Sequence, residues 1–122
     1  MNQLRLEHAA PLAYSKSTRF VETPLFTAAL KRLLDDEPYR RLQVALMLRP
    51  EQGPVISGAA GLRKLPWAGP GIGKRGGLRV IYYWAPAEAA FYMLYVYSKH
   101  EQGDLTPAQV RVLCGLVKEE FK

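Results

Sequence analysis

The fold is decided by residues 78–98, whose sequence is LRVIYYWAPAEAAFYMLYVYS. Residues 78–84 and 89–98 are two runs rich in β-branched and aromatic side chains, a composition typical of strands. The connection 85–88 is short, and strands joined by so short a connection pair antiparallel. We therefore expect a β-hairpin whose first strand is central in a sheet.

Alternation along the first run divides its side chains between two faces of the sheet. One face receives Leu78, Val80, Tyr82 and Trp84, and the other receives Arg79, Ile81 and Tyr83. The wholly apolar and aromatic set predicts the core beneath the helices, which turns Arg79 toward a second, partly open face. The same alternation puts Tyr95 and Tyr97 on one face with Phe91 and Met93, and favours core packing for that stripe.

Upstream of the hairpin the sequence predicts a strand and two helices. Residues 18–22 are typical of a short strand, and Thr23-Pro24 then supplies an N-cap hydroxyl and a proline at the first helical position. This helix runs to about Leu34, where residues 35–38, DDEP, end it and begin a second helix. The buried face of the second helix is predicted from helical spacing to hold Tyr39, Leu42 and Leu46.

The remaining elements lie on either side of the hairpin. Residues 61–65 predict a strand, and residues 67–77 form a glycine-rich loop that leads into the hairpin. Residues 104–109 contain a capping box with proline at the first helical position, which begins a helix that runs to the C-terminus. The apolar stripe of this helix is predicted to be Val110, Leu113, Val117 and Phe121.

The predicted order is β-α-α-β-β-β-α, which indicates an α+β fold. We expect a small, antiparallel-rich sheet of about four strands, packed against an N-terminal helical hairpin and a C-terminal helix. Residues 1–17 form an irregular lead, and residues 18–122 form one domain.

Composition excludes several classes of protein. The chain has 122 residues, 48% of them hydrophobic and 23% charged, as expected for a globular protein and not for a disordered one. The single Cys114 excludes an intramolecular disulfide and a thiolate pair for zinc, which favours a reducing, cytoplasmic setting. Met1–Lys16 has no apolar stretch of signal-peptide length, and no run reaches the roughly 18 residues that a membrane-spanning helix needs. We therefore expect no membrane partner.

The positive charge is concentrated in the middle of the chain. The formal net charge is +6, and residues 52–87 hold five basic and no acidic residues, namely Arg63, Lys64, Lys74, Arg75 and Arg79. Trp67, Tyr82 and Tyr83 lie among them. Cations for phosphates beside aromatic rings for bases are the two contacts that single-stranded nucleic acid needs. A solvated basic surface that aids solubility is the alternative interpretation.

Two features favour a ligand over a merely soluble surface. The loop Gly69–Gly77 has five glycines around its basic pair, so its backbone can approach a ligand closely. Arg79 lies within a hydrophobic strand, where a cation is costly without an anionic partner. The loop is not a nucleotide-binding fingerprint, because Arg75 follows Gly73-Lys74 and the loop leads into a strand.

A second candidate group follows the last strand. His100 stands between Lys99 and Glu101, and an imidazole that titrates near neutrality can move protons. A single histidine in a polar loop is also typical of an ordinary surface residue. Cys114, beside Leu113 on the last helix, fits a small buried hydrophobic residue better than a nucleophile.

Several spaced motifs resemble those of a known family. They are Gly61-Leu-Arg-Lys-Leu65, Gly73-Lys-Arg-Gly-Gly-Leu-Arg-Val-Ile-Tyr-Tyr-Trp84, Leu94-Tyr-Val-Tyr-Ser-Lys99 and Asp104-Leu-Thr-Pro107. In this order they resemble the HigB-like branch of the RelE/ParE toxin superfamily, over about residues 18–122. Members have a small sheet flanked by helices and are toxins of type II toxin–antitoxin systems.

The resemblance implies roles for single residues. Arg79 matches the strand arginine with which RelE-type toxins hold the scissile phosphate, and Lys74 and Arg75 match the basic residues before that strand. Lys99 and His100 fall where the family carries a basic pair. The catalytic tyrosine of RelE itself would fall around Leu105-Thr106, so that role is vacant here.

The function implied is a ribosome-dependent, metal-independent endoribonuclease without cofactor, which cuts messenger RNA in the ribosomal A site and thereby inhibits translation. Its catalytic residues would be Arg79, Lys74, Lys99 and His100, and its RNA-binding residues Arg63, Lys64, Trp67, Arg75 and Tyr83. A cognate antitoxin, acidic and amphipathic, would hold it inactive. The alternatives are a ParE-like poison of DNA gyrase and a non-catalytic module that binds RNA or an acidic protein.

Overall fold

The computed structural model describes residues 17–68 and 77–121, with only the backbone described at 121. Its elements follow the predicted order and confirm the α+β fold. They are β1 (Arg19–Glu22), α1 (Pro24–Leu33), α2 (Asp36–Leu48), β2 (Arg63–Trp67), β3 (Leu78–Ala85), the 3₁₀ turn η2 (Pro86–Glu88), β4 (Ala90–Ser98) and α3 (Pro107–Phe121). The expected lead lies almost wholly outside the described residues.

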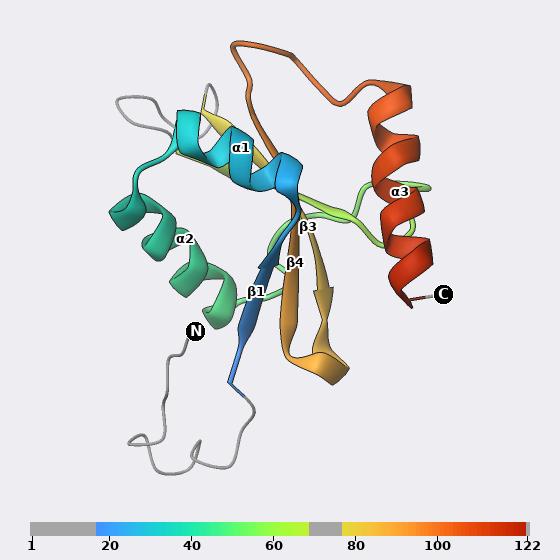
Figure 1. Ribbon diagram of the computed structural model, residues 1–122, viewed down its shortest axis with the longest axis horizontal. Coiled ribbons are helices and arrows are strands. Elements are labelled where there is room, and N and C mark those ends of the chain that lie inside the picture. The colour runs from blue at the N-terminus through green and yellow to red at the C-terminus, as the bar shows by residue number, and fades with distance from the viewer. Residues whose placement is uncertain (1–16, 69–76, 122) are drawn as a thin grey trace.

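The four strands form one mixed sheet in the order β1-β4-β3-β2. The β3–β4 hairpin is antiparallel as predicted, β2 pairs antiparallel with β3, and β1 adds to β4 in parallel. Figure 1 shows α1 and α2 on one side of this sheet and α3 on the other. The sheet is thus the middle layer of three.

Two helices begin at the caps that the sequence predicts. The Thr23 side chain accepts a hydrogen bond from the Phe26 amide at 3.0 Å, and Pro24 follows at the first helical position. At α3, the Thr106 hydroxyl accepts from the Gln109 amide at 3.1 Å, while the Gln109 side chain accepts from the Thr106 amide at 2.9 Å. Both caps satisfy amides that the first helical turn leaves without partners.

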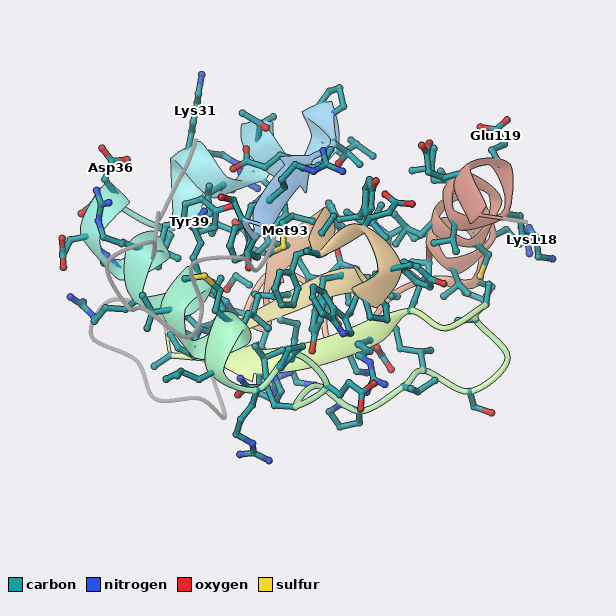
Figure 2. The ribbon with its side chains drawn as sticks, turned by 90° about the horizontal axis from the view of Figure 1, so that it is seen from below. Lys31, Asp36, Tyr39, Met93, Lys118 and Glu119 are labelled. Carbon is teal, nitrogen blue, oxygen red and sulfur yellow. The ribbon has the colours of Figure 1, made fainter. Side chains whose placement is uncertain are left out.

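The larger apolar cluster lies between the helical hairpin and the sheet. Phe26, Leu42 and Leu46 are fully buried against the even-numbered side chains of β3, as the alternation predicts. Figure 2 shows Met93 inside this layer, while Lys31 and Asp36 project outward from the helices. Burial of this apolar surface is the main force that holds the helical hairpin of α1 and α2 on the sheet.

The second face carries a cluster of its own. Leu113 and Val117 of α3 are each 2% exposed and belong to one cluster with Ile81 and Leu94 of the sheet. The expectation that the helices cover a single face is therefore wrong, since α3 packs on the opposite side from α1 and α2 (Figure 1). Leu113 and Val117 confirm the predicted stripe, whereas the side chain of Phe121 lies outside the described residues.

A β-bulge in β4 changes which face its tyrosines occupy. Ile81 pairs with Tyr95 but the next residue, Tyr82, pairs with Met93, so Leu94 is an extra residue in β4. Leu94 and Tyr95 both belong to the cluster on the α3 face, whereas Met93 belongs to the cluster under the hairpin. The predicted single stripe of Phe91, Met93, Tyr95 and Tyr97 is therefore wrong, because an inserted residue reverses the alternation beyond it.

The strand β2 begins two residues later than predicted. Residues 57–61 form turns, and Gly61 has φ +91°, a left-handed conformation that ends any extended run there. β2 then continues past the predicted end at Leu65, because Pro66 and Trp67 pair with Arg79 and Leu78. The shift extends β2 alongside the strand arginine.

Gly53→Ala is expected to destabilise the protein by about 1–3 kcal/mol, the usual cost of overpacking a core. An added Cβ would lie 3.0 Å from Tyr82 Cε1 and 3.3 Å from Leu65 Cβ. Tyr82 is fully buried and Leu65 is on a strand, so neither atom can move away easily. Urea denaturation measures the difference in the free energy of unfolding.

Gly115→Ala is the matched control. Gly115 lies in α3, is exposed, and has no atom within 4 Å of its added Cβ. This variant is expected to stabilise the protein by about 0.5–1 kcal/mol through helix propensity. Equal effects of the two substitutions would contradict the close packing described at Gly53.

Candidate functional site

Arg79 lies on the α3 face of the sheet, between two neighbouring strands. Its Cα partners are Pro66 in β2 and Tyr97 in β4, so one strand flanks it on each side. Its Nη1 donates to the Leu78 carbonyl at 3.1 Å, and the residue is half-buried. The guanidinium end of Arg79 is therefore held by its own backbone, while part of the residue stays exposed.

Asp104 joins this region to the loop after β4. Its Oδ1 accepts from Lys64 Nζ at 3.0 Å and from the Tyr97 hydroxyl at 3.5 Å. Lys99 is near enough for its charge to act on Asp104, and Arg79 for its charge to act on Tyr97. We call Lys64, Arg79, Tyr97, Lys99 and Asp104 together the strand-end cluster.

The electrostatics of the strand-end cluster are set by this one carboxylate. The hydrogen bond from Lys64 and that from the Leu105 amide hold the pKa of Asp104 below its usual range. Burial raises the pKa of Tyr97 to about 12, and the Asp104 charge adds to this effect against a smaller, opposite effect of Arg79. At neutral pH Asp104 is thus ionised and the Tyr97 hydroxyl is a hydrogen-bond donor.

The basic pair Lys99 and His100 directly follows β4, at the open end of the β3–β4 hairpin. The Lys99 amide donates to the Gly77 carbonyl at 2.9 Å, and its Nζ donates to the Gly103 carbonyl at 2.8 Å. His100 is exposed, and its amide donates to the Ser98 hydroxyl at 3.1 Å. Lys99 therefore lies in the strand-end cluster, and His100 borders it.

Tyr83 lies on the same face as Arg79, four residues further along β3, with Ile81 between them on that face. It packs against the α3-face cluster and is half-buried. A Cβ on Gly61 would lie 3.0 Å from Tyr83 Cε1, so a residue larger than glycine would displace the ring. Glycine at 61 thus permits both the left-handed turn and the position of Tyr83.

Arg63 and Trp67 lie on the opposite face from Arg79. Arg63 Nη1 donates to the carbonyls of Glu51 and Gly53, at 3.0 and 2.8 Å, and its side chain is 19% exposed. Trp67 packs against the cluster under the helical hairpin. These two predicted RNA-binding residues are therefore separated from the strand-end cluster by the sheet. Lys74 and Arg75 lie outside the described residues.

Sequence reasoning missed Asp104 and Tyr97 as members of the site. It used Asp104 in the segment that begins α3 and in one family motif, and it assigned Tyr97 to the core, where the residue is indeed buried. Tyr97 faces Arg79 because of the bulge, and Asp104 meets Lys64 across forty residues of chain. One local signal was present in the sequence. Glu101 stands next to Lys99 and His100, whereas Asp104 has no basic residue within three positions on either side.

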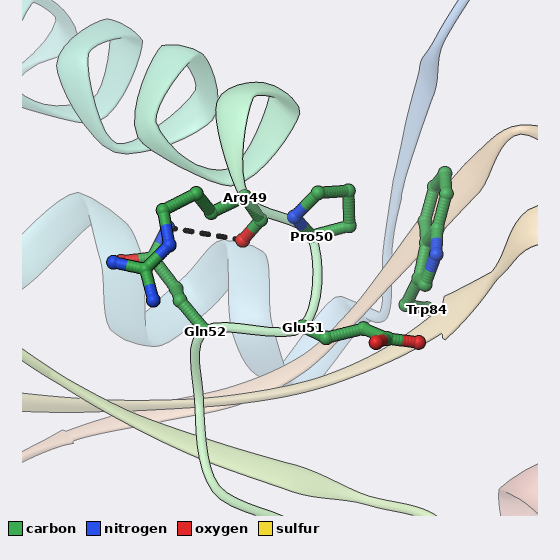
Figure 3. Close-up of a pocket in the computed structure, with 5 residues that line it drawn as sticks. All are labelled: Arg49, Pro50, Glu51, Gln52 and Trp84. Atoms are coloured by element: carbon green, nitrogen blue, oxygen red, sulfur yellow. Dashed lines mark hydrogen bonds between the residues drawn. The ribbon is translucent and has the colours of Figure 1, made fainter.

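A shallow pocket of about 300 Å³ lies elsewhere, at the C-terminal end of α2. Figure 3 shows Arg49 on one side of it and Trp84 on the other, with Pro50 and Glu51 between them. The Gln52 side chain donates to the Arg49 carbonyl at 3.1 Å. Trp84 packs against the cluster under α1 and α2, on the opposite face from Arg79. None of the residues that line this pocket is a predicted site residue.

The described residues contain neither a cluster of metal-binding side chains nor a helix that could span a membrane. Within residues 17–68 and 77–121, His, Cys, Asp and Glu do not gather in groups of three or more that could hold a metal ion. In the same part of the chain, no helix has the length and apolar character needed to cross a membrane.

Comparison with known proteins identifies the fold. No protein-family profile matches the chain. Among solved structures, it is similar to the isolated Escherichia coli RelE toxin, with a TM-score of 0.51 and 10% sequence identity, over 81% of this chain and 98% of that one. The likeness shows a RelE-like fold, as the sequence motifs predict.

Tyr97→Phe is expected to reduce the loss of stability at alkaline pH. The pKa of Tyr97 is about 12 in the folded protein and ordinarily near 10. The folded state therefore retains this proton more tightly than the unfolded state. The resulting stability is fully present below pH ~10 and is lost as the pH rises toward 12.

Urea denaturation of the wild type and of Tyr97→Phe at a series of pH values tests this expectation. The difference between the two proteins should be constant near pH 8 and should change between pH ~10 and ~12. Parallel stability profiles over that whole range would contradict the burial of the Tyr97 hydroxyl.

Proposed function

We propose that this protein is the toxin of a type II toxin–antitoxin system and cuts messenger RNA on the ribosome, in the manner of HigB-like toxins. The observation that carries the proposal is Arg79, a strand arginine in the strand-end cluster of a RelE-like fold. The order of the sequence motifs supports the HigB-like branch.

The reaction transfers the phosphoryl group to a neighbouring hydroxyl of the RNA. The 2′-hydroxyl attacks the adjacent phosphorus, the bond to the 5′-oxygen breaks, and a pentavalent dianion forms between these events. Arg79 suits the dianion, because its planar fork binds two phosphate oxygens at once. Preorganised cations of this kind contribute more in the transition state than in the bound substrate.

Lys99 and Lys64 supply further positive charge on the same face. Lys99 lies at the end of β4, and Lys64 is held on the α3 side by its ion pair with Asp104. Tyr83 offers a half-exposed ring to a base near Arg79. In this proposal Lys64 and Tyr83 contact RNA, whereas the described contacts of Arg63 and Trp67 indicate structural roles on the other face.

The proton transfers are assigned to basic residues that the family resemblance implies. One group must accept the proton of the 2′-hydroxyl, and another must protonate the leaving 5′-oxygen. His100, Lys99 and Lys74 are the candidates, since imidazole and amine groups serve in both roles when suitably tuned. Lys74 and Arg75 precede β3 in sequence, in the segment outside the described residues.

The proposal includes two partners, both anionic at the point of contact. The first is messenger RNA in the ribosomal A site, and the second is a cognate antitoxin whose acidic segment covers the basic residues. Charge complementarity favours both, because residues 52–87 carry no acid. A cytoplasmic location follows from these partners.

Arg79→Ala is expected to reduce messenger RNA cleavage by on the order of 100-fold or more, the usual effect of removing one donor to a transition-state oxyanion. Arg79→Lys should retain part of the activity, because it keeps the charge and loses the fork. The measurement is mapping of transcript 5′ ends after brief induction, with circular dichroism to verify folding.

Arg41→Ala is the matched control for this change. It removes the same charge from an exposed arginine of α2, on the hairpin side of the sheet, and should leave cleavage unchanged. Full cleavage by Arg79→Ala would contradict the proposal. Intact transcripts with broken chromosomal DNA in the wild type would favour a gyrase poison, and RNA that is bound but uncut would favour a non-catalytic module.

A further inference from the structure

Asp104 is a carboxylate held among cations. Three donors, from Lys64, Leu105 and Tyr97, lie 3.0, 2.8 and 3.5 Å from its Oδ1. Its other oxygen, Oδ2, accepts no hydrogen bond from the residues that the structure describes. The Asp104 side chain is nevertheless 69% exposed, so a ligand can reach it beside Lys64.

The loop that carries Asp104 is tied down on both sides. The Gln102 side chain donates to the Asp104 carbonyl at 2.8 Å and to Gln109 Oε1 at 2.9 Å. The Lys99 ammonium holds the Gly103 carbonyl, and the capping box of α3 begins at Thr106. Asp104 is therefore preorganised, which is what selective recognition requires.

A carboxylate in this position opposes phosphate binding. Affinity for the RNA backbone grows with the number of cations available to phosphates, and Asp104 neutralises Lys64 and repels phosphate directly. The groups of RNA that an ionised carboxylate attracts are hydrogen-bond donors, above all the exocyclic amino groups of bases. In single-stranded RNA these base edges are accessible to side chains.

We infer that Asp104 determines base specificity: its Oδ2 accepts a hydrogen bond from the amino group of one base next to the cleaved bond, adenine N6 or cytosine N4. Uracil and guanine present carbonyl oxygens at the corresponding position and are rejected by repulsion. Oδ1 is occupied by the donors of the protein, so a bidentate contact with the two N–H groups of guanine is not available. The inference rests on the proposed function, because it concerns which RNA is cut.

The test compares wild type, Asp104→Asn and Lys64→Gln by mapping transcript 5′ ends after brief induction. The wild type should show one position near the cut that is enriched in adenine and cytosine. In Asp104→Asn the amide can accept or donate, so this preference over uracil and guanine should fall by roughly tenfold, since the lost bond involves a charged acceptor.

Lys64→Gln is the matched control. It breaks the same ion pair but keeps the carboxylate, so it should lower cleavage at all sites and leave the base preference intact. A preference that persists unchanged in Asp104→Asn, or a wild type that cuts without preference at any position, would overturn the inference and leave the proposed function standing. A wild type that produces no new 5′ ends would overturn both.

Discussion

The extra residue in β4 is the constraint on which the rest of the molecule depends. At the bulge, Leu94 and Tyr95 turn to the same face, so Met93 stays under the helical hairpin while Tyr97 reaches the α3 face beside Arg79. Thr23 holds this backbone, since its amide donates to the Met93 carbonyl at 3.0 Å and its hydroxyl to the Leu94 carbonyl at 2.8 Å. The residue that caps α1 thus also satisfies the carbonyls of the irregular strand, which couples helix, sheet and site.

Most of the fold could be predicted because its signals are local. The caps at Thr23 and Thr106, the proline after each, and the alternation in residues 78–84 act within a few residues of themselves. The bulge has no such signal, because an inserted residue is decided by the register with β3 and by the contact of Thr23, which lies 71 residues away from Leu94. The position of α3 on the opposite face of the sheet was missed for a related reason. Helical spacing shows which side of α3 is apolar, but the loop before α3 decides which face of the sheet it packs against.

The candidate site could be predicted only in part. As with the fold, residues with a local signal were found, and residues placed by long-range pairing were not. Arg79 was identifiable because a cation inside an apolar strand is exceptional. Alternation puts the adjacent Arg63 and Lys64 on opposite faces of β2. Which of the two shares the face of Arg79 is set by the pairing of β2 with β3, which the sequence alone does not give. Arg63 is used to hold the loop before β2 through carbonyl oxygens of Glu51 and Gly53, whereas Lys64 meets Asp104 on the other side.

The excess of positive charge in residues 52–87 therefore overstates the number of cations that are available to a ligand. Of the five cations in residues 52–87, Arg63 is engaged with backbone carbonyls and Lys64 with a carboxylate, so both contribute to the architecture. Binding of RNA in proportion to the whole excess would require these contacts to be exchanged for phosphates, at a cost that reduces the net gain. A cluster of cations that includes one fixed carboxylate is suited to a narrower task than general affinity, because Asp104 repels a phosphate that binds beside Lys64. In the proposed function, geometry of this kind restricts the position of the RNA, and a restricted position is what converts binding into reaction at one bond.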